Sequence, residues 1–286
     1  MQPANIGEPL FYQSLNKPFK PCVIITGGTS GIGLALAHRH LALGWQVVVV
    51  GRSSDKIQQL NNEQPHILTF QCDITDINEQ RQLFEQLEKS NFERLIYCAG
   101  WYLNERVFSL NQQDSARMLA VNLQAFQAVF NWASEQLKIN NRHNKTDLNA
   151  NDQNPALICL SSIAGTMSYP YASLYTKCKR AMIATASAYR LGLKPFNINV
   201  NCIALGYVDT QTLRDLNHGD ASHKPFIMTQ ATAVEHIMRA IADNVELAVY
   251  PKSMRYLTQA LDKAPKRVLY WIIRRKLDKT PHHTNQ

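Results

Sequence analysis

The chain has 286 residues, 45% of them apolar, and a formal net charge of +8. This length and composition are enough for one large α/β domain or two small ones, which excludes intrinsic disorder, collagen and coiled coil. No run reaches the roughly 18 to 20 apolar residues of a membrane-spanning helix. Residues 1–20 lack the apolar centre of a signal peptide. We therefore expect a cytoplasmic protein.

Short apolar segments alternate with amphipathic ones along the chain. The expected strands are 23–26, 47–50, 67–70, 95–98, 157–160, 198–203 and 247–250. The expected helices are 32–43, 77–89, 115–138, 174–191 and 233–244, the last opening with a capping box of Thr232 and Glu235. Nearly continuous apolar strands are covered on both faces, and parallel strands need crossover helices. The pattern predicts an α/β fold, a Rossmann-type doubly wound parallel sheet of about seven strands with helices on both faces.

A glycine-rich turn, TGGTSGIG from Thr26 to Gly33, follows the first strand. Its glycines allow a tight turn and close approach of the backbone to a pyrophosphate at the start of the next helix, which predicts a dinucleotide site. Arg52 stands after the second strand, where an acid would bind the ribose of NAD, and its guanidinium favours the 2′-phosphate of NADP(H). The alternative is that Arg52 caps a solvated loop. Asp73, after the third strand, could reach the adenine or cap a helix.

A second group of residues comes later in the chain. Tyr175 and Lys179 are four residues apart on an expected helix, so they project from one face. A tyrosine hydroxyl, with a reference pKa of about 10, needs its phenolate stabilised to act as an acid or base near neutrality, and an ammonium group can do this. Ser162, at the end of a neighbouring strand, could hydrogen-bond a substrate oxygen. In isolation, such a Tyr and Lys pair is most often only a surface pair.

Together these motifs resemble the short-chain dehydrogenase/reductase family over about residues 21–250. The matching elements are the glycine turn Thr26–Gly33, Asp73, Tyr97-Cys98-Ala99-Gly100, Asn122, Ser162, the Tyr175 and Lys179 pair, and Leu205-Gly206 with Thr210. The resemblance implies an N-terminal extension at 1–20, a catalytic domain at 21–250 and a basic tail at 251–286.

The resemblance also implies a role for each matching residue. Tyr175 would be the general acid or base, and Lys179 would lower its pKa and hold the ribose of the cofactor. Ser162 would orient the substrate oxygen, and Asn122 would help carry a proton relay. The residues expected to bind the cofactor are Gly27, Thr29, Ser30, Gly31, Ile32, Gly33, Arg52, Asp73, Ile74, Ala99, Gly100, Tyr175, Lys179, Gly206, Val208 and Thr210.

Two departures from the family pattern concern the nicotinamide side. Tyr97 and Cys98 replace a pair of asparagines that brace neighbouring strands, and Leu205 replaces a proline. We expect altered rigidity with catalysis retained. The six cysteines are scattered without metal-ligand spacing, so we expect reduced core thiols and no metal site.

The expected activity is an NADP(H)-dependent interconversion of a carbonyl and a secondary alcohol on an apolar or lipid-like substrate. One alternative keeps the enzyme class with NAD(H) as cofactor. The other is a non-catalytic, membrane-associated protein that binds a dinucleotide. Residues 207–232 correspond to the family's substrate loop, and the family implies a homodimer or homotetramer through the helices 115–138 and 174–191.

The positive charge is concentrated at the end of the chain. Residues 250–286 carry nine basic and two acidic side chains, so residues 1–249 carry a net charge of only +1. A helix starting at Pro265 would place an apolar stripe beside these cations, which favours peripheral contact of 263–279 with a membrane surface. Docking on its own domain or on a second subunit is the alternative. No nucleic-acid-binding motif is present, and we expect no nucleic-acid partner.

Overall fold

The computed structural model describes residues 20–88, 90–103, 110–143, 154–167 and 172–262, together with positions 265 and 267. Nearly all of the expected N-terminal extension and the expected helix at 263–279 lie outside the described residues. Within the described ranges, no helix has the length and apolar content needed to cross a bilayer.

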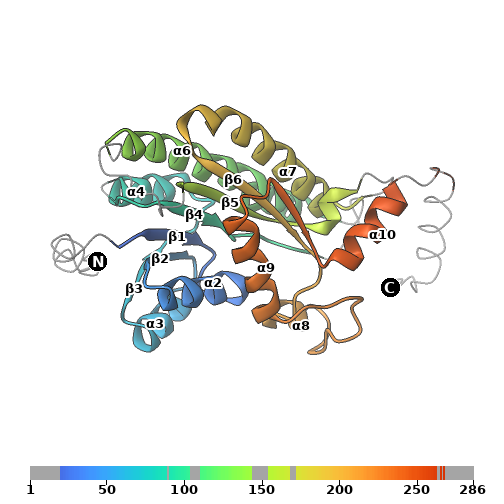
Figure 1. Ribbon diagram of the computed structural model, residues 1–286. Helices are drawn as coiled ribbons and strands as arrows, with labels where there is room; N and C mark the ends of the chain where they lie inside the picture. The colour runs from blue at the N-terminus through green and yellow to red at the C-terminus, as the bar shows by residue number, and fades with distance from the viewer. Residues whose placement is uncertain are drawn as a thin grey trace.

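A seven-stranded parallel sheet forms the centre of the molecule, as predicted (Figure 1). Its strand order is β3-β2-β1-β4-β5-β6-β7, so the direction of the strand order reverses between β1 and β4. The strands are β1 (Cys22–Thr26), β2 (Gln46–Gly51), β3 (Ile67–Gln71), β4 (Arg94–Tyr97), β5 (Ala156–Ser162), β6 (Asn199–Leu205) and β7 (Leu247–Tyr250). The helices are α2 (Gly31–Ala42), α3 (Ser54–Glu63), α4 (Ile77–Leu87), α5 (Gln112–Leu119), α6 (Ala125–His143), α7 (Leu174–Leu193), α8 (Gln211–Asp215), α9 (Gln230–Ala242) and α10 (Lys252–Asp262).

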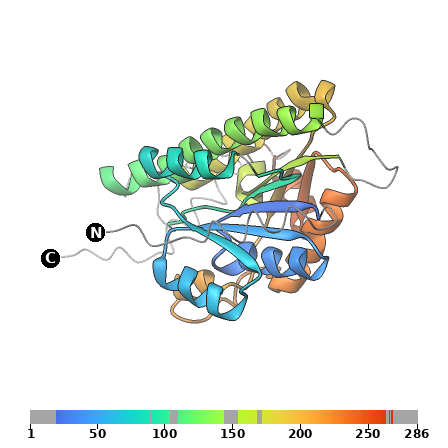
Figure 2. The same ribbon diagram turned by 90° about the vertical axis from the view of Figure 1, so that its left-hand side faces the viewer.

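Helices cover both faces of the sheet. In Figure 2 the long helices α6 and α7 run along one face, and α2 and α3 cover the other. Successive strand residues point to opposite faces. Val48 therefore packs in the core beneath α4, α6 and α7, and its neighbour Val49 packs in the core beneath α2 and α9. Both valines are completely buried, which explains why β2 carries four consecutive valines.

The structure differs from the sequence prediction in several places, and α3 and α8 were not among the expected helices. The predicted capping box is wrong, because Thr229 is the N-cap of α9 and its hydroxyl accepts a hydrogen bond from the amide of Thr232 at 3.1 Å. The predicted helix 115–138 is interrupted by a π-helical turn at Ala120–Gln124, and α6 continues to His143. Helix α10 follows β7 directly, at the carboxyl end of that strand (Figure 1), where the sequence indicated only the start of a tail.

All six cysteines are free thiols. Five are buried, and Cys98 is intermediate in exposure. This agrees with the prediction of reduced core residues.

Candidate active site

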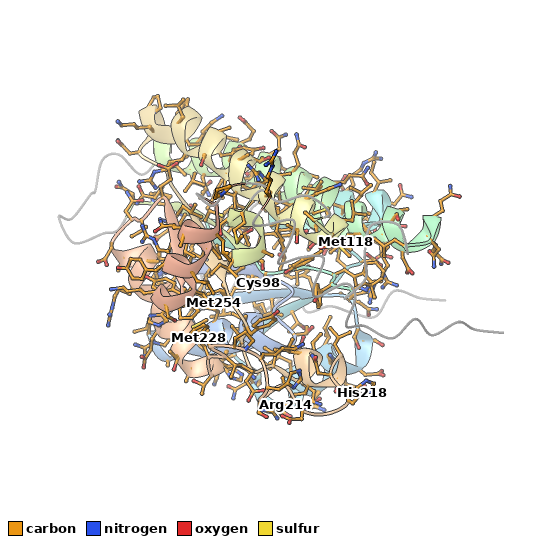
Figure 3. The ribbon with its side chains drawn as sticks, turned by 90° about the vertical axis from the view of Figure 1, so that its right-hand side faces the viewer. Cys98, Met118, Arg214, His218, Met228 and Met254 are labelled. Carbon is orange, nitrogen blue, oxygen red and sulfur yellow. The ribbon has the colours of Figure 1, made fainter. Side chains whose placement is uncertain are left out.

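A cavity of about 1240 Å³ lies at the carboxyl edge of the sheet. Figure 3 views the molecule from this side, with Cys98 and Met254, which both line the cavity, near its centre. Pockets for a single small molecule occupy roughly 300 to 1,000 Å³. The cavity therefore has room for two ligands, such as a dinucleotide and a substrate. All sixteen predicted cofactor-binding residues line it, and so does Ser162.

The glycine turn between β1 and α2 is shaped for close backbone approach. Gly27 has a φ of +68°, in the left-handed region that favours glycine. A Cβ atom on Gly33 would lie 2.3 Å from the carbonyl oxygen of Gly27, and one on Gly28 would lie 2.9 Å from a methyl group of Val49. Side chains at these positions are thus excluded by neighbouring atoms.

The start of α2 keeps its amide donors available for an anion. Its N-cap, Ser30, makes no side-chain hydrogen bond to the first turn. In six other helices the N-cap side chain accepts from a first-turn amide, namely α3, α4, α5, α7, α8 and α9. Unpaired first-turn amides and the positive end of the helix dipole together form an anion site. These features fit the pyrophosphate of a dinucleotide.

Arg52 and Asp73 face each other at the other end of the cofactor region. An Nη atom of Arg52 lies 3.8 Å from a carboxylate oxygen of Asp73, and the Arg52 side chain is 59% exposed. Partial burial alone would raise the pKa of Asp73, but hydrogen bonds from Thr75 and the charges of Arg52 and Arg117 bring this pKa below its ordinary value. Asp73 does not cap α4, since Asp76 does. An exposed ion pair of this kind is weak, so the guanidinium can turn to a phosphate.

Ser162, Tyr175 and Lys179 meet at the floor of the cavity. Ser162 ends β5, and Tyr175 lies in the first turn of α7, where the N-cap Ser173 accepts from the amide of Thr176. Tyr175 and Ser162 share a hydrogen bond, which lowers the pKa of Tyr175, but burial outweighs it and raises this pKa to about 12. Tyr175 therefore carries its proton at neutral pH and can act as a general acid.

Lys179 lies one helical turn after Tyr175 and is 95% buried. Its ammonium is 5.7 Å from the centre of the Tyr175 ring and donates a hydrogen bond to the carbonyl of Leu160 at 3.2 Å. Burial lowers the pKa of Lys179. Lys179 is not among the groups that shift the pKa of Tyr175, which burial raises, so the lowering of this pKa by Lys179 stays a prediction.

Asn122 lies beneath the cavity and is not among its lining residues. It is completely buried within the π-helical turn, and its amide donates to the carbonyls of Trp101 at 2.8 Å and Met118 at 3.1 Å. Its side-chain oxygen has no partner among the described residues. That oxygen would be 3.5 Å from a Cβ on Gly100, close beneath the cavity floor. A buried acceptor without a partner is costly and often marks a site for a water or a functional group.

Tyr97, one of the two departures from the family pattern, supplies a brace of its own. Its hydroxyl donates to the carbonyl of Val121 at 2.6 Å, inside the π-helical turn, and the side chain is fully buried. Replacement of the asparagine pair was expected to remove hydrogen bonds that brace neighbouring strands. The Tyr97 hydrogen bond compensates in part, because it joins β4 to the segment that carries Asn122.

Tyr102 and helix α10 are among the contributors to the cavity that sequence reasoning missed. The ring of Tyr102 packs edge-on against Tyr175, with centroids 4.7 Å apart. On α10, Met254, Leu257, Thr258 and Leu261 line the cavity. Their spacing of three, one and three residues is the pattern of one helix face, and this signal could have identified α10 from the sequence. Trp101, considered as a wall, does line the cavity, whereas Tyr169 and Tyr171 lie outside the described residues.

Comparisons with known proteins agree with this geometry. The family model for short chain dehydrogenases matches residues 21–221. The chain belongs to the short-chain dehydrogenase/reductase family. It is an oxidoreductase of that family, a group whose members act on CH–OH or carbonyl groups.

Three similar proteins illustrate the relationship. The uncharacterized oxidoreductase DltE of Bacillus subtilis (strain 168) is 41% identical over 80 residues, which is 27% of this chain and only 32% of that protein. The NADP-dependent (R)-specific alcohol dehydrogenase of Lentilactobacillus kefiri is 28% identical over 200 residues, 68% of this chain and 75% of the relative. The structure of a short-chain dehydrogenase from Sphingobium yanoikuyae in complex with NADPH has a TM-score of 0.71 at 18% identity, and the match covers 93% of this chain and 98% of that one.

Proposed function

We propose that the protein is an NADP(H)-dependent short-chain oxidoreductase that interconverts a carbonyl and a secondary alcohol on an apolar substrate, within a catalytic domain at 21–250. The observation that carries this proposal is the meeting of Ser162, Tyr175 and Lys179 in the cavity that the glycine turn also lines. Kinship with an alcohol dehydrogenase supports the type of reaction.

We propose one role for each of these side chains. Ser162 hydrogen-bonds the substrate oxygen and holds it beside Tyr175. In reduction, the Tyr175 hydroxyl gives its proton to that oxygen, and in oxidation the phenolate removes it. Lys179 stabilises the phenolate through its charge, and Asn122 supports a proton path below the floor. A bound nicotinamide dinucleotide supplies or accepts the hydride.

Turnover of a small panel of apolar ketones with NADPH, by wild type and Tyr175→Phe, tests the proposal. Nicotinamide fluorescence measures cofactor binding in the same samples. We expect the variant to keep NADPH binding and to lose activity by about 10² to 10⁴-fold. Tyr256→Phe, which removes the hydroxyl of an exposed tyrosine that does not line the cavity, is the matched control and should stay active. Turnover that survives in Tyr175→Phe would show that another group supplies the proton, whereas a wild type without any turnover would favour the non-catalytic alternative.

The preference for NADP(H) over NAD(H) rests on Arg52. No acid follows β2 before α3 begins, and the guanidinium is exposed beside the cofactor region. Arg52→Ala should weaken NADPH binding at least tenfold and leave NADH binding nearly unchanged, because only NADPH carries the 2′-phosphate. Arg39→Ala removes an exposed cation of α2 that does not line the cavity, and so controls for the change in net charge. Equal weakening of both cofactors would favour the NAD(H) alternative.

We also propose assembly as a homodimer or homotetramer through α6 and α7. A shallow groove of about 430 Å³ lies between these helices, with Gln127 and Tyr189 among its lining residues. Sedimentation equilibrium of wild type and Tyr189→Arg tests this interface. A monomeric wild type would contradict it.

Peripheral membrane contact through 263–279 remains a prediction, since these residues lie outside those described. Co-sedimentation with vesicles of phosphatidylglycerol or phosphatidylcholine tests it on the full chain. Binding to the anionic vesicles that is lost in Arg274→Glu/Arg275→Glu is the expected result. Equal recovery with both lipids, or none with either, would argue that the tail docks on protein.

A further inference from the structure

Helix α10 presents two different sides. Met254, Leu257, Thr258 and Leu261 face the cavity, whereas Arg255 and Tyr256 do not line it and are exposed. Three of the four cavity-facing residues are large and apolar. The helix therefore contributes an apolar wall to the cavity and a polar or aromatic surface to solvent.

Contacts with the end of the sheet fix the position of this wall. The Sδ atom of Met254 lies 2.9 Å from where a Cβ on Gly206 would be, and the amide of Gly206 donates to the carbonyl of Tyr250 at 2.7 Å. The helix also packs on the 3-10 turn Ile163–Thr166, which directly follows Ser162. The apolar wall is thus anchored beside Ser162, at the reacting end of the cavity.

The cavity mouth leaves apolar side chains in contact with water. Among the large apolar side chains that are exposed in the described part of the chain, Leu216 and Leu257 are the two that line the cavity. Leu257 is 48% exposed and Leu216, just after α8, is 37% exposed. Removing apolar area from water favours binding, so a ligand that covers these side chains gains affinity from them.

We infer that α10 is the substrate-selecting wall of the active site, and that the substrate places a bulky apolar group against Met254, Leu257 and Leu261. This inference rests on the proposed function and adds to it the element that reads the substrate. The family model matches residues 21–221. The residues of α10 that would select the substrate therefore lie outside the segment that matches the family model.

The test compares neighbouring residues of α10. Leu257→Ala shortens the wall, and Tyr256→Ala removes an exposed ring that does not line the cavity. The measurement is kcat/KM with NADPH for 2-butanone and for 2-octanone. In Leu257→Ala we expect the preference for 2-octanone over 2-butanone to fall at least fivefold, with NADPH affinity unchanged. Leu257→Met, which retains the volume, should restore the preference, and Tyr256→Ala should leave it unchanged.

A preference that is unchanged in Leu257→Ala, or that falls equally in Tyr256→Ala, would overturn the inference. Ligand-observed NMR of 2-octanone binding to the same variants tests the wall without turnover. Wild type that reduces no ketone would contradict the proposed reaction. If 2-octanone still binds to wild type and to Tyr256→Ala but more weakly to Leu257→Ala, the inference about the wall stands. If Tyr175→Phe abolishes turnover while all α10 variants behave like wild type, the reaction stands and the wall fails.

Discussion

Tyr102 packs its ring edge-on against the ring of Tyr175, with 4.7 Å between the ring centroids and an angle of 70° between the planes. Tyr102 also lines the cavity. The tyrosine proposed to transfer the proton is therefore held by an aromatic neighbour as well as by its hydrogen bond with Ser162.

We predict that Tyr102→Ala lowers kcat about 2 to 10-fold, because an aromatic pair contributes about 0.5 to 1.5 kcal/mol beyond its buried area. Tyr102→Phe retains the ring and should stay within about twofold of wild type. Steady-state kinetics on both variants, with NADPH affinity measured in parallel, separates positioning of Tyr175 from loss of the cofactor. Equal losses in the two variants would assign the effect to the hydroxyl of Tyr102.

The pKa of Tyr175 sets the pH dependence. Reduction needs the protonated hydroxyl, which is present below the pKa and lost as the pH rises through it. Burial raises this pKa to about 12, above its ordinary value of 10. We therefore predict that kcat/KM for reduction shows no alkaline decline before about pH 10. A decline centred near neutrality would show that a different group supplies the proton.

Two glycine substitutions test different properties: one should weaken cofactor binding, and the other should raise the free energy of unfolding. Gly33→Ala places a methyl group 2.3 Å from the carbonyl oxygen of Gly27, so the turn must shift and NADPH binding should weaken at least tenfold. Gly192, in α7, has no atom within 4 Å of an added Cβ. Gly192→Ala should raise the free energy of unfolding by about 0.5 to 1 kcal/mol, since alanine is the better helix former. Urea unfolding and cofactor titration measure the two effects.

Asn122 joins the π-helical turn to the loop that follows β4. Asn122→Ala leaves the carbonyls of Trp101 and Met118 without this donor, and we predict a loss of about 1 to 3 kcal/mol in the free energy of unfolding. Gln113→Ala, on the exposed side of α5, is the control and should stay within about 0.5 kcal/mol of wild type. A fully stable Asn122→Ala would mean that water replaces the amide.

The sheet could be predicted from the sequence because its strands carry a strong local signal. The four valines of β2 follow one another without a polar residue, and the segment before them, 32–43, was expected to be a helix and is one. The glycine turn and the pair Tyr175 and Lys179 were predictable for the same reason, since their function depends on fixed spacing along one strand-turn-helix or one helix face.

Features that depend on tertiary contacts were not predictable. The contact between Tyr102 and Tyr175 joins a loop to a helix 73 residues later, and no local pattern encodes it. The break of the long helix at Ala120–Gln124 arises where Tyr97 and Trp101 contact the turn. The capping box failed for a local reason, because Thr229 and Thr232 are both hydroxyl residues three apart and the chain uses the earlier one as the cap.

Val49 belongs to the core beneath α2, yet its two methyl groups lie 2.9 and 3.0 Å from the Cβ position of Gly28, directly under the glycine turn. The turn thus rests on a side chain that never meets solvent. Nucleotide affinity in this protein therefore depends in part on its interior. A larger or smaller residue at position 49 would shift the backbone of the glycine turn that faces the pyrophosphate.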